Sequence, residues 1–248
     1  MSQKIGNYEI ECLVSAEFQR RLFYAFDNHS KKVVIKESLV NQKNDLKKEY
    51  NTLSSIKHPN IIKPIDFFEQ NDRFYMVMPR GLTDLFEYMN DHKIPNQTIQ
   101  ELMHSLFSAV RYLHDSQICH RNITPNNVII FEDNSKQVFI LSGFGQTINF
   151  NGDITDIIAG SNLFKAPELA ENQSYTNKVD CWSLGILMYV LFKMVFPFDE
   201  NNNPRVDALD LSEIPEQAAD LISHLICLDP EKRFSAKQAL EHPYFQNH

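Results

Sequence analysis

The sequence predicts an α+β fold, with strands gathered in the first third of the chain and helices in the remainder. Before residue 40, three runs carry β-branched and aromatic residues, at 8–14, 21–26 and 31–38. After "PRGLTD", apolar residues recur at helical spacing instead. The pattern changes near 79–82. A chain of 248 residues forms one large domain or two small ones that share a core.

The individual elements follow from the same two periodicities. Leu46, Tyr50, Leu53 and Ile56 fall on one face of a helix over 41–56. Later elements are expected as two strands and four helices, at 61–69, 73–78, 84–92, 98–116, 184–192 and 216–228. The helix near Trp182 is apolar on all sides, which predicts a buried helix.

Composition limits the classes of protein and of partner. Asp and Glu number 32 against 24 Lys and Arg, so the balance is acidic and argues against a nucleic-acid or anionic-membrane binder. The four cysteines form no C-x-x-C pair, which favours buried reduced thiols over a disulfide framework. The run 184–192 is too short to span a bilayer, and the first residues lack a signal-peptide core. We expect a soluble, cytoplasmic protein.

Eight short motifs in order resemble the protein kinase family over nearly the whole chain. They are "VVIK", Glu49 before "HPNII", "DLFEY", "YLHDSQICHRNITPNNVII", "VFILSGFG", "GSNLFKAPE", "DCWSLGILMY" and "DPEKRFSAKQALEHPYF". The chain is most similar to Ser/Thr kinases of the calcium/calmodulin- and AMP-regulated branch. The resemblance implies a bilobal fold with a strand-rich N-lobe (1–78), a hinge linker (79–82) and a helical C-lobe (83–248).

The resemblance also implies residues for binding ATP. Lys36 matches the lysine that pairs with the α- and β-phosphates, and Glu49 matches its carboxylate partner. The other matched positions are the gatekeeper Met78, the hinge residues Pro79 and Gly81, Asp84 toward the ribose, and Val34 and Ile129 in the adenine pocket. Val34 stands where the family has Ala, so we expect either a narrowed pocket or simply a residue that suits a strand.

The phosphate-binding loop departs from the family. Its glycine positions hold Val14, Ala16 and Gln19, although glycine is used there so that backbone approaches phosphate closely. The spacing also suggests one extra residue. Arg20 and Arg21 are interpreted as a solvated basic pair, with phosphate contact as the alternative.

The metal position departs as well. The family's magnesium-binding aspartate is Gly143, and only Asn127 remains as a second ligand. Ser142 is one residue out of register and should point away, which leaves Asp153 and Asp156 of the following loop as the remaining carboxylates. We therefore expect no obligate metal.

The catalytic loop has lost its acid–base chemistry. Asn122 stands where the family has the aspartate that accepts the substrate proton, and an amide is no proton acceptor near neutral pH. Thr124 stands where Ser/Thr kinases have a lysine for the γ-phosphate, so that charge is missing too.

The framework positions are retained. Glu168 and Arg233 match a buried ion pair, Asp180 matches the residue that braces the catalytic loop, and His120, Phe144 and Leu53 match an apolar stack whose fourth position is Pro64. Arg121 matches the residue that binds a phosphorylated activation loop, with Thr147, Thr155 and Ser161 as candidate phosphorylation sites. The segment between 198 and 214 is too short for the family's docking helix, which we expect to be reduced or missing.

Three hypotheses stay open. The first is a pseudokinase that acts as a scaffold or allosteric partner of another protein. The second is a weak or atypical Ser/Thr kinase that uses Lys36, Glu49 and Asn127. The third is a sensor that binds ATP without turnover.

Overall fold

The computed structural model describes residues 3–17, 20–38, 43–150, 162–171, 173–198, 206 and 209–246. The chain divides into two compact units, Met1–Leu82 and Thr83–His248. Each unit is described by itself below. No helix in the described part of the chain is long and apolar enough to cross a membrane.

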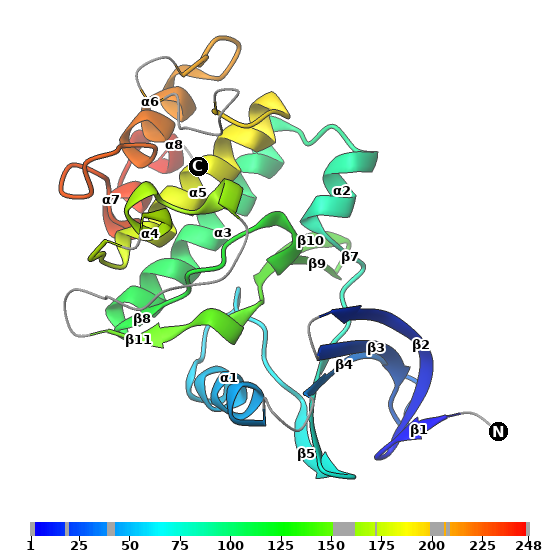
Figure 1. The fold of residues 1–248 in the computed structure, drawn as a ribbon. Helices are drawn as coiled ribbons and strands as arrows, with labels where there is room; N and C mark the ends of the chain where they lie inside the picture. Colours follow the sequence, from blue (N-terminus) through cyan, green and yellow to red (C-terminus); the bar gives the residue numbers. More distant parts are fainter. Residues whose placement is uncertain are drawn as a thin grey trace. The chain divides into compact units, whose positions relative to one another are not determined.

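The first unit is a six-stranded antiparallel sheet with one helix, α1 (Lys43–Ser55), drawn in light blue in Figure 1. The strand order is β1-β2-β3-β4-β6-β5. The strands are β1 (Lys4–Ile5), β2 (Tyr8–Glu17), β3 (Arg20–Phe26), β4 (Lys32–Ser38), β5 (Asp66–Gln70) and β6 (Arg73–Pro79). Their register sends every second residue of a strand to the same face, and one face holds a core that includes Phe23, Ile35 and Val77.

Two details of this unit correct the sequence analysis. The strand expected over 61–69 begins only at Asp66, because Pro64 lacks a backbone N–H for the ladder. Pro79, which the sequence placed in the linker, is instead the last residue of β6.

The cysteines of both units differ from the expectation of buried thiols. Cys12 is exposed and Cys227 is half-buried, so only Cys119 and Cys181 are buried thiols; all four cysteines are free.

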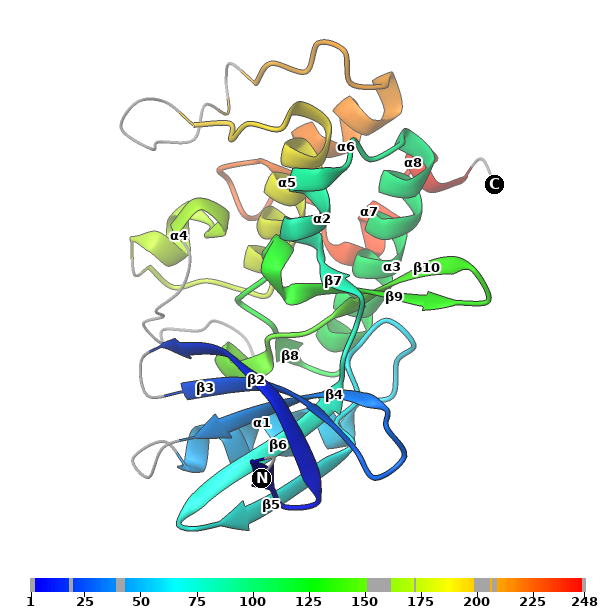
Figure 2. The same cartoon turned by 90° about the vertical axis from the view of Figure 1, so that its right-hand side faces the viewer.

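The second unit is mainly helical, with α5 at its centre (Figures 1 and 2). Its residues from Val179 to Leu191 are all buried, as the apolar sequence predicts. Helix α3 contacts α5, and the buried residues of its apolar face include Leu102, Leu106 and Val110. The helices are α2 (Leu85–Asp91), α3 (Asn96–Asp115), α4 (Pro167–Ala170), α5 (Lys178–Lys193), α6 (Glu216–Leu225), α7 (Ala236–Leu240) and α8 (Pro243–Gln246).

Short strands and 3-10 turns support the catalytic-loop region of this unit. One sheet has the order β10-β9-β7 and another pairs β11 with β8. These elements are β7 (Thr83–Asp84), β8 (Ile118–Cys119), η2 (Pro125–Asn127), β9 (Val128–Asp133), β10 (Lys136–Leu141), η3 (Phe144–Gln146), β11 (Ile148–Asn149) and η4 (Asn162–Phe164). Between 206 and 215, the residues that the structure describes form no α-helix, whereas the rest of the expected docking-helix segment lies outside the described residues.

Candidate functional site

The first unit joins Lys36 on β4 to Glu49 on α1. Lys36 Nζ lies 2.8 Å from Glu49 Oε1 and 2.5 Å from Glu49 Oε2. The carboxylate is buried with 3 % of its side chain exposed, and the lysine keeps 17 %. A carboxylate this deeply buried needs its partner, so the pair fastens the helix to the sheet, and part of the lysine side chain stays exposed.

The face of the sheet that carries Lys36 is lined with large side chains. Directly paired residues of an antiparallel sheet point to the same face. Leu22 and Met76 flank Lys36 in this way, and one step along the strands Tyr24 and Met78 flank Val34. The position where the family has a small residue therefore holds a branched side chain between an aromatic and a methionine.

Arg80 strengthens the edge of this face, a contact that the sequence analysis missed. Its guanidinium carbon lies 3.5 Å from the centre of the Tyr24 ring, and the same group forms an ion pair with Glu11. A cation over an aromatic face is attracted by the ring's negative π-surface. Through these two contacts, Arg80 connects the chain after Pro79 to β2 and β3 of the same unit.

The described positions that match the phosphate-binding loop lie in the antiparallel pair of β2 and β3. Val14 and Ala16 lie within β2, and Ala16 pairs with Arg21 of β3. Register shifts after Ile10 and after Leu13 each place an additional residue in β2, which fits the extra residue that the spacing suggested. Gln19 lies outside the described residues, as does the side chain of Arg20.

Arg21 forms an ion pair with a buried carboxylate, while 38 % of its side chain stays exposed. Its Nη2 donates to Glu37 Oε1 at 2.8 Å. Glu37 is only 1 % exposed and also accepts from Arg73 at 2.5 Å and from the Tyr75 hydroxyl at 3.2 Å. Glu37 raises the pKa of Tyr75 in addition to the effect of burial. One signal was available: Val33, Ile35 and Glu37 alternate, so a carboxylate falls on the core face.

In the second unit, Asp180 holds the catalytic loop by its backbone. The Arg121 N–H donates to Asp180 Oδ1 at 2.7 Å and the His120 N–H to Oδ2 at 2.8 Å. His114 Nε2 lies 2.9 Å from the same Oδ2. Asp180 is fully buried; burial alone would raise its pKa, but the bonds from His114 and the loop outweigh burial and lower the pKa.

Two of the positions that depart from the family, Asn122 and Thr124, lie in the loop that Asp180 holds, and the third, Gly143, follows β10. The Asn122 N–H donates to His120 Nδ1 at 3.2 Å, and the Asn122 carbonyl accepts from Asn127 Nδ2 at 2.8 Å. Thr124 is 8 % exposed and precedes η2 as its N-cap. Gly143, in the segment after β10, has the left-handed conformation, with φ 81° and ψ 40°. The loop thus keeps an ordered backbone, while Asn122, Thr124 and the separate Gly143 supply no charge.

Asp84, Ile129 and Ser142 each have a contact within the second unit. Asp84 Oδ1 accepts from the Glu87 N–H at 2.9 Å and caps α2, so its carboxylate is partly committed to the fold. The spacing of Asp84 and Glu87 resembles a capping box and signals this role. Ile129 of β9 pairs directly with Asp84 of β7. Ser142 Oγ donates to the Asn127 carbonyl at 3.1 Å.

The candidate metal carboxylates Asp153 and Asp156 lie outside the described residues, together with Thr155 and Ser161. In the part that the structure describes, no group of three or more His, Cys, Asp or Glu side chains is arranged to hold a metal ion.

The Arg121 side chain donates hydrogen bonds to other residues of the second unit. Its Nε donates to the Gln146 carbonyl at 2.6 Å and its Nη1 to the Tyr175 hydroxyl at 2.8 Å. Thr147 is 5 % exposed and donates its hydroxyl to the Phe144 carbonyl at 2.8 Å. Burial of this hydroxyl corrects the suggestion of Thr147 as a phosphorylation site, because a phosphate there would displace the turn.

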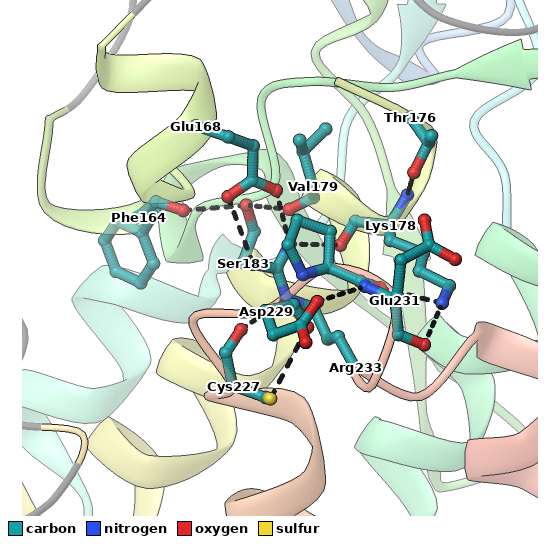
Figure 3. Close-up of polar contacts among 11 residues, drawn as sticks. Phe164, Glu168, Thr176, Lys178, Val179, Ser183, Cys227, Asp229, Glu231 and Arg233 are labelled. Carbon is teal, nitrogen blue, oxygen red and sulfur yellow. Dashed lines mark hydrogen bonds and ion pairs between the residues drawn. The ribbon is translucent and has the colours of Figure 1, made fainter. Parts of the chain in front are cut away.

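The framework residues are buried within their own units. Arg233 donates to both oxygens of Glu168, at 2.6 and 3.1 Å, and to the Cys227 carbonyl at 3.0 Å (Figure 3). Its guanidinium also lies over Trp182, 5.0 Å from the ring centre. His120 and Phe144 meet edge-to-face with ring centres 4.7 Å apart. Leu53 is buried within the first unit.

Comparison with known proteins gives the family. The protein kinase domain model matches residues 23–245. The chain belongs to the protein kinase family. This kinase domain is 28 % identical over 226 residues to calcium/calmodulin-dependent protein kinase type 1 of Macrobrachium nipponense, covering 86 % of this chain and 66 % of that protein.

Other relatives agree with the assignment. The domain is 26 % identical to calcium/calmodulin-dependent protein kinase type 1 of Caenorhabditis elegans, over 86 % of this chain and 65 % of that protein. It is 32 % identical to probable serine/threonine-protein kinase fhkC of Dictyostelium discoideum, over 84 % of this chain and 38 % of that protein. The kinase domain therefore spans less than two thirds of the length of these relatives.

Proposed function

We propose that this kinase domain is a pseudokinase, which acts as a scaffold or allosteric partner of another protein. One observation carries the proposal. Asp180 holds the catalytic loop, yet Asn122, Thr124 and, in the segment after β10, Gly143 stand at the positions where phosphoryl transfer needs a base, a cation and a metal ligand. Loss of a general base alone typically costs about 10²–10⁴ in rate. The framework around Asp180, Glu168 and Arg233 is kept, which is what a binding function requires.

Nucleotide binding without metal is the second part of the proposal. The Lys36–Glu49 pair is formed, and 17 % of the Lys36 side chain is exposed, which supports contact with a phosphate oxygen. We also propose that the domain acts in cytoplasmic signalling; two of its relatives are calcium/calmodulin-dependent protein kinases.

A weakly active Ser/Thr kinase is the alternative, and the same Lys36–Glu49 pair supports it. An ATP sensor without turnover is the third candidate. Metal dependence separates the weak kinase from the other two candidates, because phosphoryl transfer relies on a cation to neutralise the developing charge.

A thermal-shift series with ATP, with and without magnesium, tests the proposal. ATP should raise Tm equally in magnesium and in EDTA, and Lys36→Met should abolish the rise. Lys47→Met, the same change at an exposed lysine of α1, is the control. A rise that requires magnesium would instead favour the weak kinase, and no rise with any nucleotide would leave scaffolding alone.

A further inference from the structure

Glu37 of β4 is a buried carboxylate on the opposite face of the sheet from Lys36. Successive residues of a strand point to opposite faces, and Glu37 alternates with Ile35 and Val33, which belong to the core of the first unit. Only 1 % of Glu37 is exposed. The groups that contact Glu37 on this face are therefore separate from the face that carries Lys36.

Two arginines converge on this one carboxylate. Arg21 approaches side-on, with Nη2 2.8 Å from Oε1 and Nε 2.5 Å from Oε2 of Glu37. Arg73 adds its Nη1, which lies 2.5 Å from the same Oε1. The Tyr75 hydroxyl also donates to Oε1, at 3.2 Å. Two positive charges thus share one negative charge, which leaves a local surplus of one positive charge.

Arg73 keeps hydrogen-bond donors that Glu37 does not use. A guanidinium carries five N–H groups, and among the described residues the Arg73 side chain donates to Glu37 alone, through Nη1. Arg21 is 38 % exposed and Arg73 is 33 % exposed. Part of each arginine is therefore accessible, and the shared carboxylate fixes where both guanidiniums lie before any ligand arrives.

A phosphate monoester matches this chemistry. It carries close to two negative charges near neutral pH and three terminal oxygens that accept hydrogen bonds. Guanidinium groups bind such oxygens through planar pairs of N–H donors. The chain as a whole is acidic, with 32 Asp and Glu against 24 Lys and Arg, so attraction for an anion depends on a local surplus such as this one.

We propose that Arg21 and Arg73, held by Glu37, form a binding site for a phosphate monoester. Two sources share this chemistry: a free phosphate compound and a phosphorylated side chain of another protein. The site lies on the opposite face of β4 from Lys36, so it does not depend on nucleotide binding.

Calorimetric titration of the full chain with three probes tests the site and its source. The probes are inorganic phosphate, a short peptide that contains phosphoserine, and the same peptide without phosphate, at low salt so that screening is weak. We expect the phosphopeptide to bind and the unmodified peptide not to bind. Binding of inorganic phosphate as well would identify a free phosphate compound as a sufficient ligand, and binding of the phosphopeptide alone would identify a phosphorylated protein. Absence of binding by both phosphate probes would overturn the proposal.

Arg73→Lys tests the guanidinium without removing the charge beside Glu37, so the fold should be retained. Affinity for the phosphopeptide should fall roughly tenfold, because a charge-assisted pair of N–H donors is lost. Arg111→Lys is the matched control, since Arg111 is an exposed arginine of α3 that pairs with Asp115. Equal affinity of wild type and Arg73→Lys, with equal Tm, would contradict the site.

Lys36→Met separates this site from the proposed nucleotide site. The phosphopeptide carries no base, and its affinity should be unchanged by Lys36→Met even if no nucleotide binds to the domain. Loss of phosphopeptide binding in this variant would show that the phosphate binds at Lys36, and would overturn the assignment to Arg21 and Arg73.

Discussion

Arg233 donates to both carboxylate oxygens of Glu168, at 2.6 and 3.1 Å, with neither side chain more than 6 % exposed. Removing one member leaves the other charge buried without compensation. Arg233→Met should therefore lower the free energy of unfolding by about 3–5 kcal/mol, measured by urea denaturation.

Two companion variants show whether burial is the cause. Lys193→Met breaks an ion pair with the exposed Asp210 and should leave stability nearly unchanged. The double variant Glu168→Leu with Arg233→Met should lose less than the two single losses combined. Strict additivity would show that the two residues act separately.

Asp180 should make stability depend on pH in acid. Its pKa is lowered in the folded state, because the bonds from His114 and the loop outweigh its burial. Between this lowered value and the ordinary 3.8, the unfolded chain binds more protons. The stabilisation is therefore complete above the ordinary value and is lost as pH falls through the lowered one.

The comparison with Asp180→Asn isolates this contribution from the other carboxylates. We expect the variant to be less stable near neutrality and the difference from wild type to shrink as the pH falls below about 4. Urea unfolding across that range measures it. A difference that stays constant with pH would mean that Asp180 acts without its charge.

Val34 should limit access of a base to the sheet face that it shares with Tyr24 and Met78. If nucleotide binds there, Val34→Ala should tighten ATP binding roughly tenfold, since relief of overpacking is worth about 1–3 kcal/mol. Calorimetric titration measures the affinity. Ile35→Val is the control, because Ile35 faces the opposite, core side of β4. Equal or weaker binding by Val34→Ala would show that the face is not crowded.

Restoring two family residues should revive little chemistry. Asn122→Asp with Gly143→Asp returns a base and a metal ligand, but a side chain at 143 meets Asn127 and position 124 still lacks its cation. We expect phosphate transfer to rise by less than the roughly 10²-fold that a base alone can contribute. A larger gain, measured with labelled ATP, would show that Thr124 and the altered loop matter little.

The sequence predicted the elements whose periodicity is long and regular. The face of α3 with Leu102 and Leu106, the apolar α5 and the alternation of β4 were all legible. The strand near Pro64 was placed too early, because an apolar run alone does not show where ladder bonding begins. The family resemblance rested on motifs in order, and the match to the kinase domain confirmed it.

Side-chain partners across strands were the part that sequence could not supply. Arg21 lies beside Glu37 only because of the β3–β4 register. Arg80, which follows β6, contacts the Tyr24 ring of β3. Gly143 was identified as a degenerate metal position and Asn127 as a weak remaining ligand, yet the fit of Asn127 against Gly143 depends on the φ of Gly143. Such contacts depend on register and backbone angles, which no local pattern in a single sequence fixes.

Transfer of labelled γ-phosphate from ATP tests the central claim most directly. The wild-type chain and Lys36→Met would be compared with magnesium and a generic protein substrate, after Tm shows that both are folded. We predict no transfer by wild type above the Lys36→Met background. Transfer that the wild type performs and Lys36→Met abolishes would contradict the account and make this domain a working kinase.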